Sequence, residues 1–362
     1  MTVVWSKTTK KLCRWRHFPS FSLSSASKKA MSLLPLYPQQ AYEVNNGVVL
    51  NVASAEIDNV CHEIKAACAG FGTDESRLSR VLGSLKPNIR HLVSVRYPQL
   101  HKGRTLLAEV QGETSGSYGK LCELLAQPLE EAEAMIVRNA TKGMGTKENL
   151  LYPVFSGRTA EELTILKKAF FKVFGEDLVV VIADDIGGDL KKHYLSVLNV
   201  LTQSYDPSIH TQRKAEEVAE VIYKAGEGKW GTDEATFCNT LWSIPPQFMT
   251  QVNAAYVAKH KNSLARAIEK EFGGHTERAM LFHYNMITDP INTIADQFEK
   301  TMKGMGTDEF GLSAALVRYQ AYLPQIAPVY KTKYGQSLRD RIYGETSGNF
   351  RKLLMTVVEH SL

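Results

Sequence analysis

The sequence predicts an all-α protein built from four repeats. A glycine-threonine motif recurs four times, and the segments between its copies carry apolar residues at helical spacing. The copies read GFGTDE from Gly70, GMGTKE from Gly143, KWGTDE from Lys229 and GMGTDE from Gly304. An Asp or Glu lies 39 to 41 residues after the glycine that precedes each threonine. A spacing that is kept four times indicates that loop and acid belong to one structural unit.

Each repeat is predicted to be a small helical bundle. Before the third motif, apolar residues recur at spacings of three and four, at Val218, Val221, Ile222 and Ala225, which is typical of a helix with one buried face. The same pattern follows the fourth acid, at Phe350, Leu353, Leu354, Val357 and Val358. We expect the threonine of each motif to cap the helix that follows, with the next acidic residues in its first turn.

These patterns divide the chain into six segments. They are a basic, serine-rich tail at 1–50, repeat 1 at 51–127, repeat 2 at 128–200, a linker at 201–212, repeat 3 at 213–287 and repeat 4 at 288–362. The linker contains the polar, Pro-containing stretch DPSIHTQRK. It is expected to divide the body into two halves.

Charge and composition exclude several classes of function. The formal charge is +5, but residues 1–40 hold seven Lys and Arg and no acid, so the rest of the chain is near −2 and does not predict a nucleic-acid-binding surface. No apolar run reaches the length of a membrane-spanning helix, so any membrane contact is expected to be peripheral. Five widely spaced cysteines without a CxxC pair fit a reduced, cytoplasmic setting. Residues 1–30 have the composition of a mitochondrial transit peptide and equally that of a disordered tail.

Each loop has the chemistry of a calcium site. Ca²⁺ takes six to eight oxygen ligands, and a glycine-rich turn can aim backbone carbonyls inward because no side chain obstructs it. The distant acid would add one carboxylate, which predicts weak affinity for free calcium, about 10⁻⁴ M or poorer. The alternative is a purely structural turn between two helices.

An anionic ligand would strengthen such a site, and a phospholipid phosphate is the natural candidate. The residue before the last glycine of each motif is apolar, which suits a membrane interface. These four predicted membrane-contact residues are Phe71, Met144, Trp230 and Met305. Four weak sites that engage one membrane together predict a steep response to calcium.

The chain resembles the annexins from about Ala55 to its C-terminus. The resemblance lies in the repeated GxGT motif and its distant acid, and is specific in GEGKWGTDE, MKGMGTDE and SGRTAEEL. It implies four repeats of about five helices in a slightly curved disc, with Ca²⁺ loops on the convex face that bind acidic phospholipid membranes reversibly from the cytoplasm. Lateral self-assembly on the membrane is a further option.

The resemblance also implies the calcium ligands. They are Cys68, Gly70, Gly72 and Glu113 in repeat 1; Thr141, Gly143, Gly145 and Asp185 in repeat 2; Gly226, Lys229, Gly231 and Glu271 in repeat 3; and Met302, Gly304, Gly306 and Glu345 in repeat 4. Repeat 2 departs most, because Lys147 replaces an acid and Pro153 is expected to interrupt the following helix. The arginine usual twelve residues after the threonine is kept as Arg158, whereas the other repeats have Leu85, Ile244 and Tyr319 there.

Two other functions compete with calcium-dependent membrane binding. A calcium-independent helical-repeat scaffold would explain the helices but not the fixed acids. A membrane-associated enzyme lacks support, since no GxSxG, HExxH or P-loop pattern occurs. We therefore expect no enzymatic activity. No EF-hand pattern occurs either, so calcium is expected to bind only through the interhelical loops.

Overall fold

The computed structural model describes residues 33–37, 54–70, 72–143, 145–199 and 202–362. Met31–Leu362 form one compact unit, distinct from Met1–Ala30. The described residues contain helices and no strand, which confirms the all-α prediction. None of the helices among them is long and apolar enough to span a bilayer.

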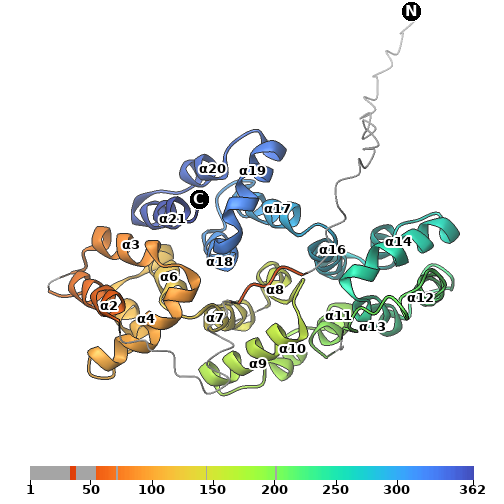
Figure 1. Cartoon of the computed structure of the whole chain (residues 1–362), viewed down its shortest axis with the longest axis horizontal. Coiled ribbons are helices and arrows are strands. Elements are labelled where there is room, and N and C mark those ends of the chain that lie inside the picture. The colour runs from red at the N-terminus through yellow and green to blue at the C-terminus, as the bar shows by residue number, and fades with distance from the viewer. Residues whose placement is uncertain (1–32, 38–53, 71, 144, 200–201) are drawn as a thin grey trace, which may run out of the picture. The chain divides into compact units, whose positions relative to one another are not determined.

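Each repeat contains five α-helices (Figure 1). Repeat 1 holds α2 (Ala55–Ala67), α3 (Glu75–Ser84), α4 (Pro87–Leu100), α5 (Leu106–Glu113) and α6 (Gly116–Leu125). Repeat 2 holds α7 (Leu129–Thr141), α8 (Glu148–Phe155), α9 (Ala160–Phe174), α10 (Leu178–Asp185) and α11 (Gly188–Asn199). Repeat 3 holds α12 (Gln212–Ala225), α13 (Glu234–Ser243), α14 (Pro246–His260), α15 (Leu264–Glu271) and α16 (Gly274–Thr288). Repeat 4 holds α17 (Pro290–Met302), α18 (Glu309–Tyr319), the short 3₁₀ helix η2 (Gln320–Tyr322), α19 (Leu323–Tyr334), α20 (Leu338–Glu345) and α21 (Gly348–Ser361).

The repeats associate through their second and fifth helices. In repeats 1 and 4, α3 packs against α21 and α6 against α18 (Figure 1). In repeats 2 and 3, α11 packs against α13 and α8 against α16. Contacts of α18 with α7 and α8 join the two pairs. One apolar core therefore runs through all four repeats.

The fourth helix of each repeat carries the distant acid as its last residue. These helices, α5, α10, α15 and α20, each have eight residues and begin with a buried leucine. A side chain caps the start of each one: Thr105, Asp177, Ser263 and Ser337 accept a hydrogen bond from a backbone amide of the first turn. Leucine and cap fix one end of the helix, so the acid is held at the other.

The predicted threonine caps are wrong. The helices that follow the motifs are capped instead by the next residue, where Asp74, Asp233 and Asp308 accept a backbone amide hydrogen bond. Lys147 stands at this position in repeat 2 and forms no side-chain cap. An aspartate is as good a cap as threonine, and it leaves the threonine hydroxyl free for another partner.

Helix α8 also differs from the prediction. It continues through Pro153 and ends at Phe155, two residues later than an interruption at the proline would give. The Pro153 carbonyl accepts a hydrogen bond from the Arg318 guanidinium at 2.6 Å. This bond satisfies a carbonyl of the last turn, which has no partner within the helix.

A buried ion cluster lies where repeats 2 and 4 meet. Glu133 on α7 pairs with Arg158 at 2.9 Å and with Arg318 at 2.7 Å, and all three side chains are almost fully buried. Burial alone would raise the pKa of Glu133, but the two guanidinium groups outweigh it and lower that pKa. In repeat 4 the usual arginine position is occupied by Tyr319. Arg318, one residue earlier, supplies the second guanidinium of this cluster instead.

Part of the predicted tail packs on this cluster. The backbone amides of Leu36 and Tyr37 donate to Glu162 at 2.7 and 3.2 Å, and the Tyr37 hydroxyl donates to Glu133 at 2.5 Å. Both residues are buried. Residues 33–37 thus belong to the folded body.

Candidate metal centres

The structure brings each distant acid to its loop. In every repeat the motif threonine hydroxyl lies within hydrogen-bond distance of the carboxylate at the end of the fourth helix. The oxygen to oxygen distances are 3.2 Å for Thr73–Glu113, 2.6 Å for Thr146–Asp185, 2.5 Å for Thr232–Glu271 and 3.3 Å for Thr307–Glu345. In repeats 1 and 4 the hydroxyl lies closer still to the backbone carbonyl oxygen of the same acidic residue, at 2.8 and 3.0 Å. The hydroxyl that does not cap a helix therefore orients the acid.

A second contact closes each loop onto the helix before it. The backbone amide after the threonine donates to a carbonyl in the last turn of the first helix. These bonds are Asp74 to Ala67 at 2.9 Å, Lys147 to Ala140 at 2.9 Å, Asp233 to Ala225 at 2.7 Å and Asp308 to Thr301 at 2.8 Å. The bond spans seven residues in repeats 1, 2 and 4 and eight in repeat 3, so the third loop is one residue longer.

Glu227 anchors the longer loop of repeat 3. Its carboxylate accepts from the Tyr256 hydroxyl and the Asn262 amide at 2.8 Å each, and from the Lys270 ammonium at 2.7 Å. These partners hold the additional loop residue against α14 and α15. Glu227 is not among the residues predicted from the sequence, although it is a third carboxylate in GEGKWGTDE.

The motif glycines adopt backbone conformations that other residues rarely take. Gly70, Gly72, Gly304 and Gly306 have φ values of +106°, +91°, +118° and +91°, in a region that is unfavourable for residues with a Cβ atom. Gly226 differs from these glycines, because a Cβ atom there would lie 3.0 Å from Cγ of Glu271, closer than Cβ atoms usually approach a neighbour. The third loop therefore lies close to its acid, and a side chain at Gly226 would displace the Glu271 side chain.

The donors at these loops fit a hard cation. No group of three or more His, Cys, Asp or Glu side chains converges within the described ranges, so a cation site there has to draw mainly on backbone carbonyls. Each loop offers carbonyls from a glycine turn and from a helix end, together with one half-buried carboxylate. Oxygen donors in a flexible loop suit Ca²⁺. The carboxylates lie in the last turn of their helices, where the helix dipole opposes a negative charge, so an added cation would stabilise them.

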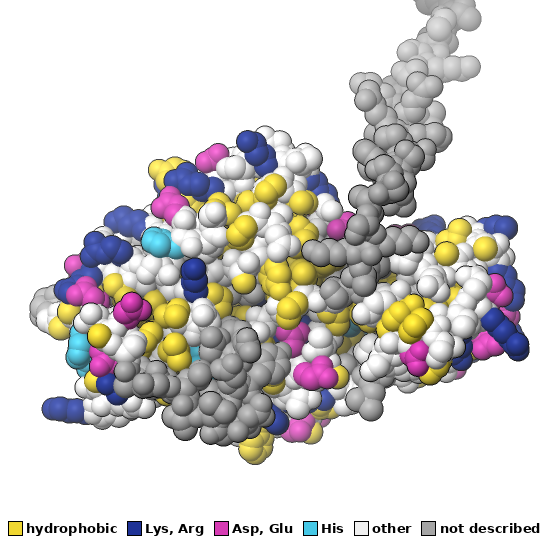
Figure 2. Space-filling view, viewed as in Figure 1, with side chains coloured by type: hydrophobic (Ala, Val, Ile, Leu, Met, Phe, Trp, Pro, Cys, Tyr) yellow, Lys and Arg dark blue, Asp and Glu magenta, His cyan; other side chains and the backbone are white. Residues whose placement is uncertain are grey.

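The two described loop tips are exposed and apolar. Trp230 and Met305 are both fully exposed, more than any other large hydrophobic side chain in the described residues. Phe71 and Met144, which were predicted to have the same role, lie outside the described residues. Around the body, Lys and Arg side chains are interspersed with Asp and Glu on the face shown in Figure 2.

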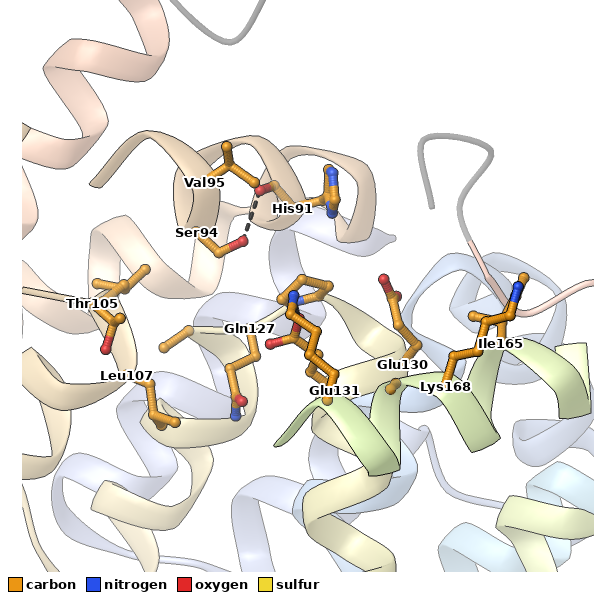
Figure 3. Close-up of a pocket in the computed structure, with 15 residues that line it drawn as sticks. His91, Ser94, Val95, Thr105, Leu107, Gln127, Glu130, Glu131, Ile165 and Lys168 are labelled. Carbon is orange, nitrogen blue, oxygen red and sulfur yellow. Dashed lines mark hydrogen bonds and ion pairs between the residues drawn. The ribbon is translucent and has the colours of Figure 1, made fainter. Parts of the chain in front are cut away.

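A cavity of about 470 Å³ lies apart from the loops, between repeats 1 and 2 (Figure 3). It is lined by the beginnings of α5 and α7, whereas the acid of repeat 1 and the loop of repeat 2 lie at the far ends of those helices. Burial raises the pKa of Glu130 in its wall to about 7 and lowers the pKa of His91. No predicted metal ligand lines it.

Comparison with known proteins decides the family. The family model for annexins matches residues 60–125, 132–197, 217–282 and 294–357, one match for each repeat. The chain belongs to the annexin family. Annexin A13 of Mus musculus is 31% identical over 304 residues, which cover 84% of this chain and 95% of that protein. Annexin A5 of Cynops pyrrhogaster is 31% identical over 81% of this chain and 90% of its own.

Solved annexin structures agree with the fold. The structure of annexin III has a TM-score of 0.76 at 26% identity and covers 83% of this chain and 93% of its own. Chicken annexin V has a TM-score of 0.72 at 25% identity, with 84% and 96% covered. The annexins are a family of calcium-dependent, peripheral phospholipid-binding proteins that are in general not enzymes.

Proposed function

We propose that this annexin binds acidic phospholipid membranes in a calcium-dependent manner through its four interhelical loops. The observation that carries the proposal is the threonine to acid contact, which occurs in all four repeats. A loop that served only as a turn would not need a carboxylate 39 to 41 residues after its last glycine, yet all four loops have one. The scaffold alternative gives this recurrence no cause.

Each residue of a loop has a distinct part in holding the cation. In repeat 1 the carbonyls of Cys68, Gly70 and Gly72 and the carboxylate of Glu113 would be the ligands. In repeat 2 they would be Thr141, Gly143, Gly145 and Asp185, and in repeat 3 Gly226, Lys229, Gly231 and Glu271. In repeat 4 they would be Met302, Gly304, Gly306 and Glu345. The bound Ca²⁺ supplies a positive charge that a lipid phosphate can also ligate, while the threonine hydroxyl keeps the acid directed toward the loop.

The exposed tips add apolar contact at the same place. Trp230 and Met305 project fully into solvent beside two of the predicted sites. A tryptophan side chain is well suited to the headgroup region of a bilayer, because its ring is amphipathic. Charge attraction and apolar insertion would thus act at the same point of contact with the membrane. Because both need the loaded loops, the protein would be cytoplasmic until the calcium concentration rises.

Removal of the four carboxylates tests the proposal. We expect a variant with Glu113→Gln, Asp185→Asn, Glu271→Gln and Glu345→Gln to keep its helical circular dichroism and its thermal midpoint, because these side chains are half-exposed. It should lose the calcium binding that titration calorimetry detects with phosphatidylserine vesicles present. Calcium binding equal to that of the unaltered protein would contradict the proposal.

A further inference from the structure

Repeat 4 differs from the other repeats because a cationic side chain lies between two of its predicted calcium ligands. The Arg341 guanidinium pairs with the Glu345 carboxylate at 2.7 Å and donates a hydrogen bond to the Met302 carbonyl oxygen, also at 2.7 Å. Among the described residues, Glu345 is the only one of the four loop acids that forms an ion pair. All four acids, Glu345 included, also bond to their motif threonines.

The sequence explains why only repeat 4 has this contact. Arg341 lies four residues before the acid, which places both side chains on one face of α20. The equivalent positions are Glu109, Val181 and Ala267 in the other three repeats. Glu109 is buried and pairs with Lys65 and Arg104 at 2.9 and 2.8 Å rather than with the loop acid. Within the described residues, repeat 4 is therefore the only repeat in which a cationic side chain pairs with the loop acid.

We infer that the Arg341 guanidinium is a tethered competitor of calcium in the repeat 4 loop, so that this loop loads at higher calcium than it would without the arginine. The inference rests on the proposed function. A guanidinium with one N–H group on a carbonyl ligand and another on the carboxylate ligand uses the two oxygens that Ca²⁺ would need. A guanidinium and a Ca²⁺ ion that shared these two ligands would lie close together and repel each other. The arginine therefore has to leave before calcium can enter.

The surroundings allow the arginine to leave without unfolding the helix. Its side chain is about one quarter exposed, and its Nε atom has no hydrogen-bond partner. Glu299 on α17 lies 3.5 Å from that Nε atom and accepts a hydrogen bond from the Tyr330 hydroxyl. Glu299 gives the displaced guanidinium a second carboxylate, so its charge remains paired when it releases Glu345.

A protein with only the fourth site intact would measure the competition directly. The background variant carries Glu113→Gln, Asp185→Asn and Glu271→Gln. Adding Arg341→Ala copies the residue that repeat 3 has at this position, Ala267. We expect Arg341→Ala to lower the calcium concentration for half-saturation about tenfold, which corresponds to about 1.4 kcal/mol. The readouts are calorimetric calcium titration and the rise of the thermal midpoint with calcium.

Arg339→Ala in the same background is the matched control. Arg339 lies on the same helix and carries the same charge as Arg341, but it pairs with Glu359 at 2.8 Å and not with a predicted ligand. It should leave calcium affinity unchanged. Arg341→Met, which keeps the aliphatic part of the side chain, replaces Arg341→Ala if the alanine variant loses helical circular dichroism.

The outcomes separate this inference from the proposed function. If the unaltered protein binds calcium but Arg341→Ala leaves repeat 4 affinity unchanged or weaker, the competitor role is wrong and the loop mechanism stands. If neither the unaltered protein nor Arg341→Ala binds calcium, both are wrong. Tighter binding that appears with Arg339→Ala as well would show a general charge effect and would also overturn the specific role of Arg341.

Discussion

Replacement of the exposed tips should weaken membrane binding without changing the fold. The change is Trp230→Ser together with Met305→Ser. Both side chains are fully exposed in the folded protein, so their loss removes no core contact. We expect the free energy of unfolding to stay within about 0.5 kcal/mol of its original value, as is usual for surface substitutions.

The effect on membrane affinity follows from the area that the tips can bury. An aromatic side chain buries roughly 150–250 Å², and apolar burial contributes about 25 cal/mol per Å². Complete insertion of Trp230 would therefore contribute about 4–6 kcal/mol. If about half of the ring enters the bilayer, the loss is about 2–3 kcal/mol, or roughly 30- to 150-fold in affinity.

The assay is equilibrium binding to phosphatidylserine vesicles at fixed calcium. Phe171→Ser is the matched control, because Phe171 is 61% exposed but lies near the end of α9. The eight-residue helix α10 separates that end from Asp185 by about 12 Å. Unchanged affinity of the tip variant, or an equal loss with Phe171→Ser, would refute insertion of the tips.

Three further predictions concern the ligands, the caps and a buried histidine. Glu113→Gln combined with Glu345→Gln should raise the calcium needed for vesicle binding about tenfold, or about 1.4 kcal/mol, because each altered loop loses its one charged ligand; an unchanged calcium titration would contradict the ligand assignment. Asp233→Ala should lower urea-unfolding stability by about 1 kcal/mol through loss of a helix cap, whereas Thr232→Ala should chiefly reduce calcium affinity; the reverse pattern would show that the threonine is the cap. Burial lowers the pKa of His283 to about 3, so its neutral form stabilises the fold above pH 6.5 and this stability is lost as the pH falls toward 3. Between pH 7 and pH 5 the loss is about 2 kcal/mol, and a His283→Phe variant with the same pH slope in urea unfolding would disprove this origin.

The arrangement of loop and acid could be predicted from the sequence because it repeats. A fixed separation between glycine and carboxylate is a long-range distance constraint, and four copies of it give a consistent solution. Helical periodicity predicted the all-α class, whereas the expected number of about five helices in each repeat came from the resemblance to the annexins.

The predictions that failed, or were not made, depend on competition between neighbours. Threonine and aspartate are both good caps, and only the three-dimensional contact with the carboxylate decides that the threonine is used elsewhere. Arg318 was not predicted to have a role, because the expected arginine position is Tyr319, one residue later. Arg341 did carry a local signal, an i, i+4 pair with Glu345, but its hydrogen bond to Met302 links two helices that are far apart in the chain. Such contacts become visible only after the helices are assembled.

Co-sedimentation with phosphatidylserine vesicles is the most direct test of calcium-dependent membrane binding by the loops. The protein is mixed with vesicles in calcium, then in chelator, and in parallel with vesicles that lack acidic lipid. The loop mechanism predicts that the protein pellets only with acidic vesicles and calcium, and returns to the supernatant when chelator is added. Pelleting that is independent of calcium would contradict that mechanism and would favour a helical-repeat scaffold.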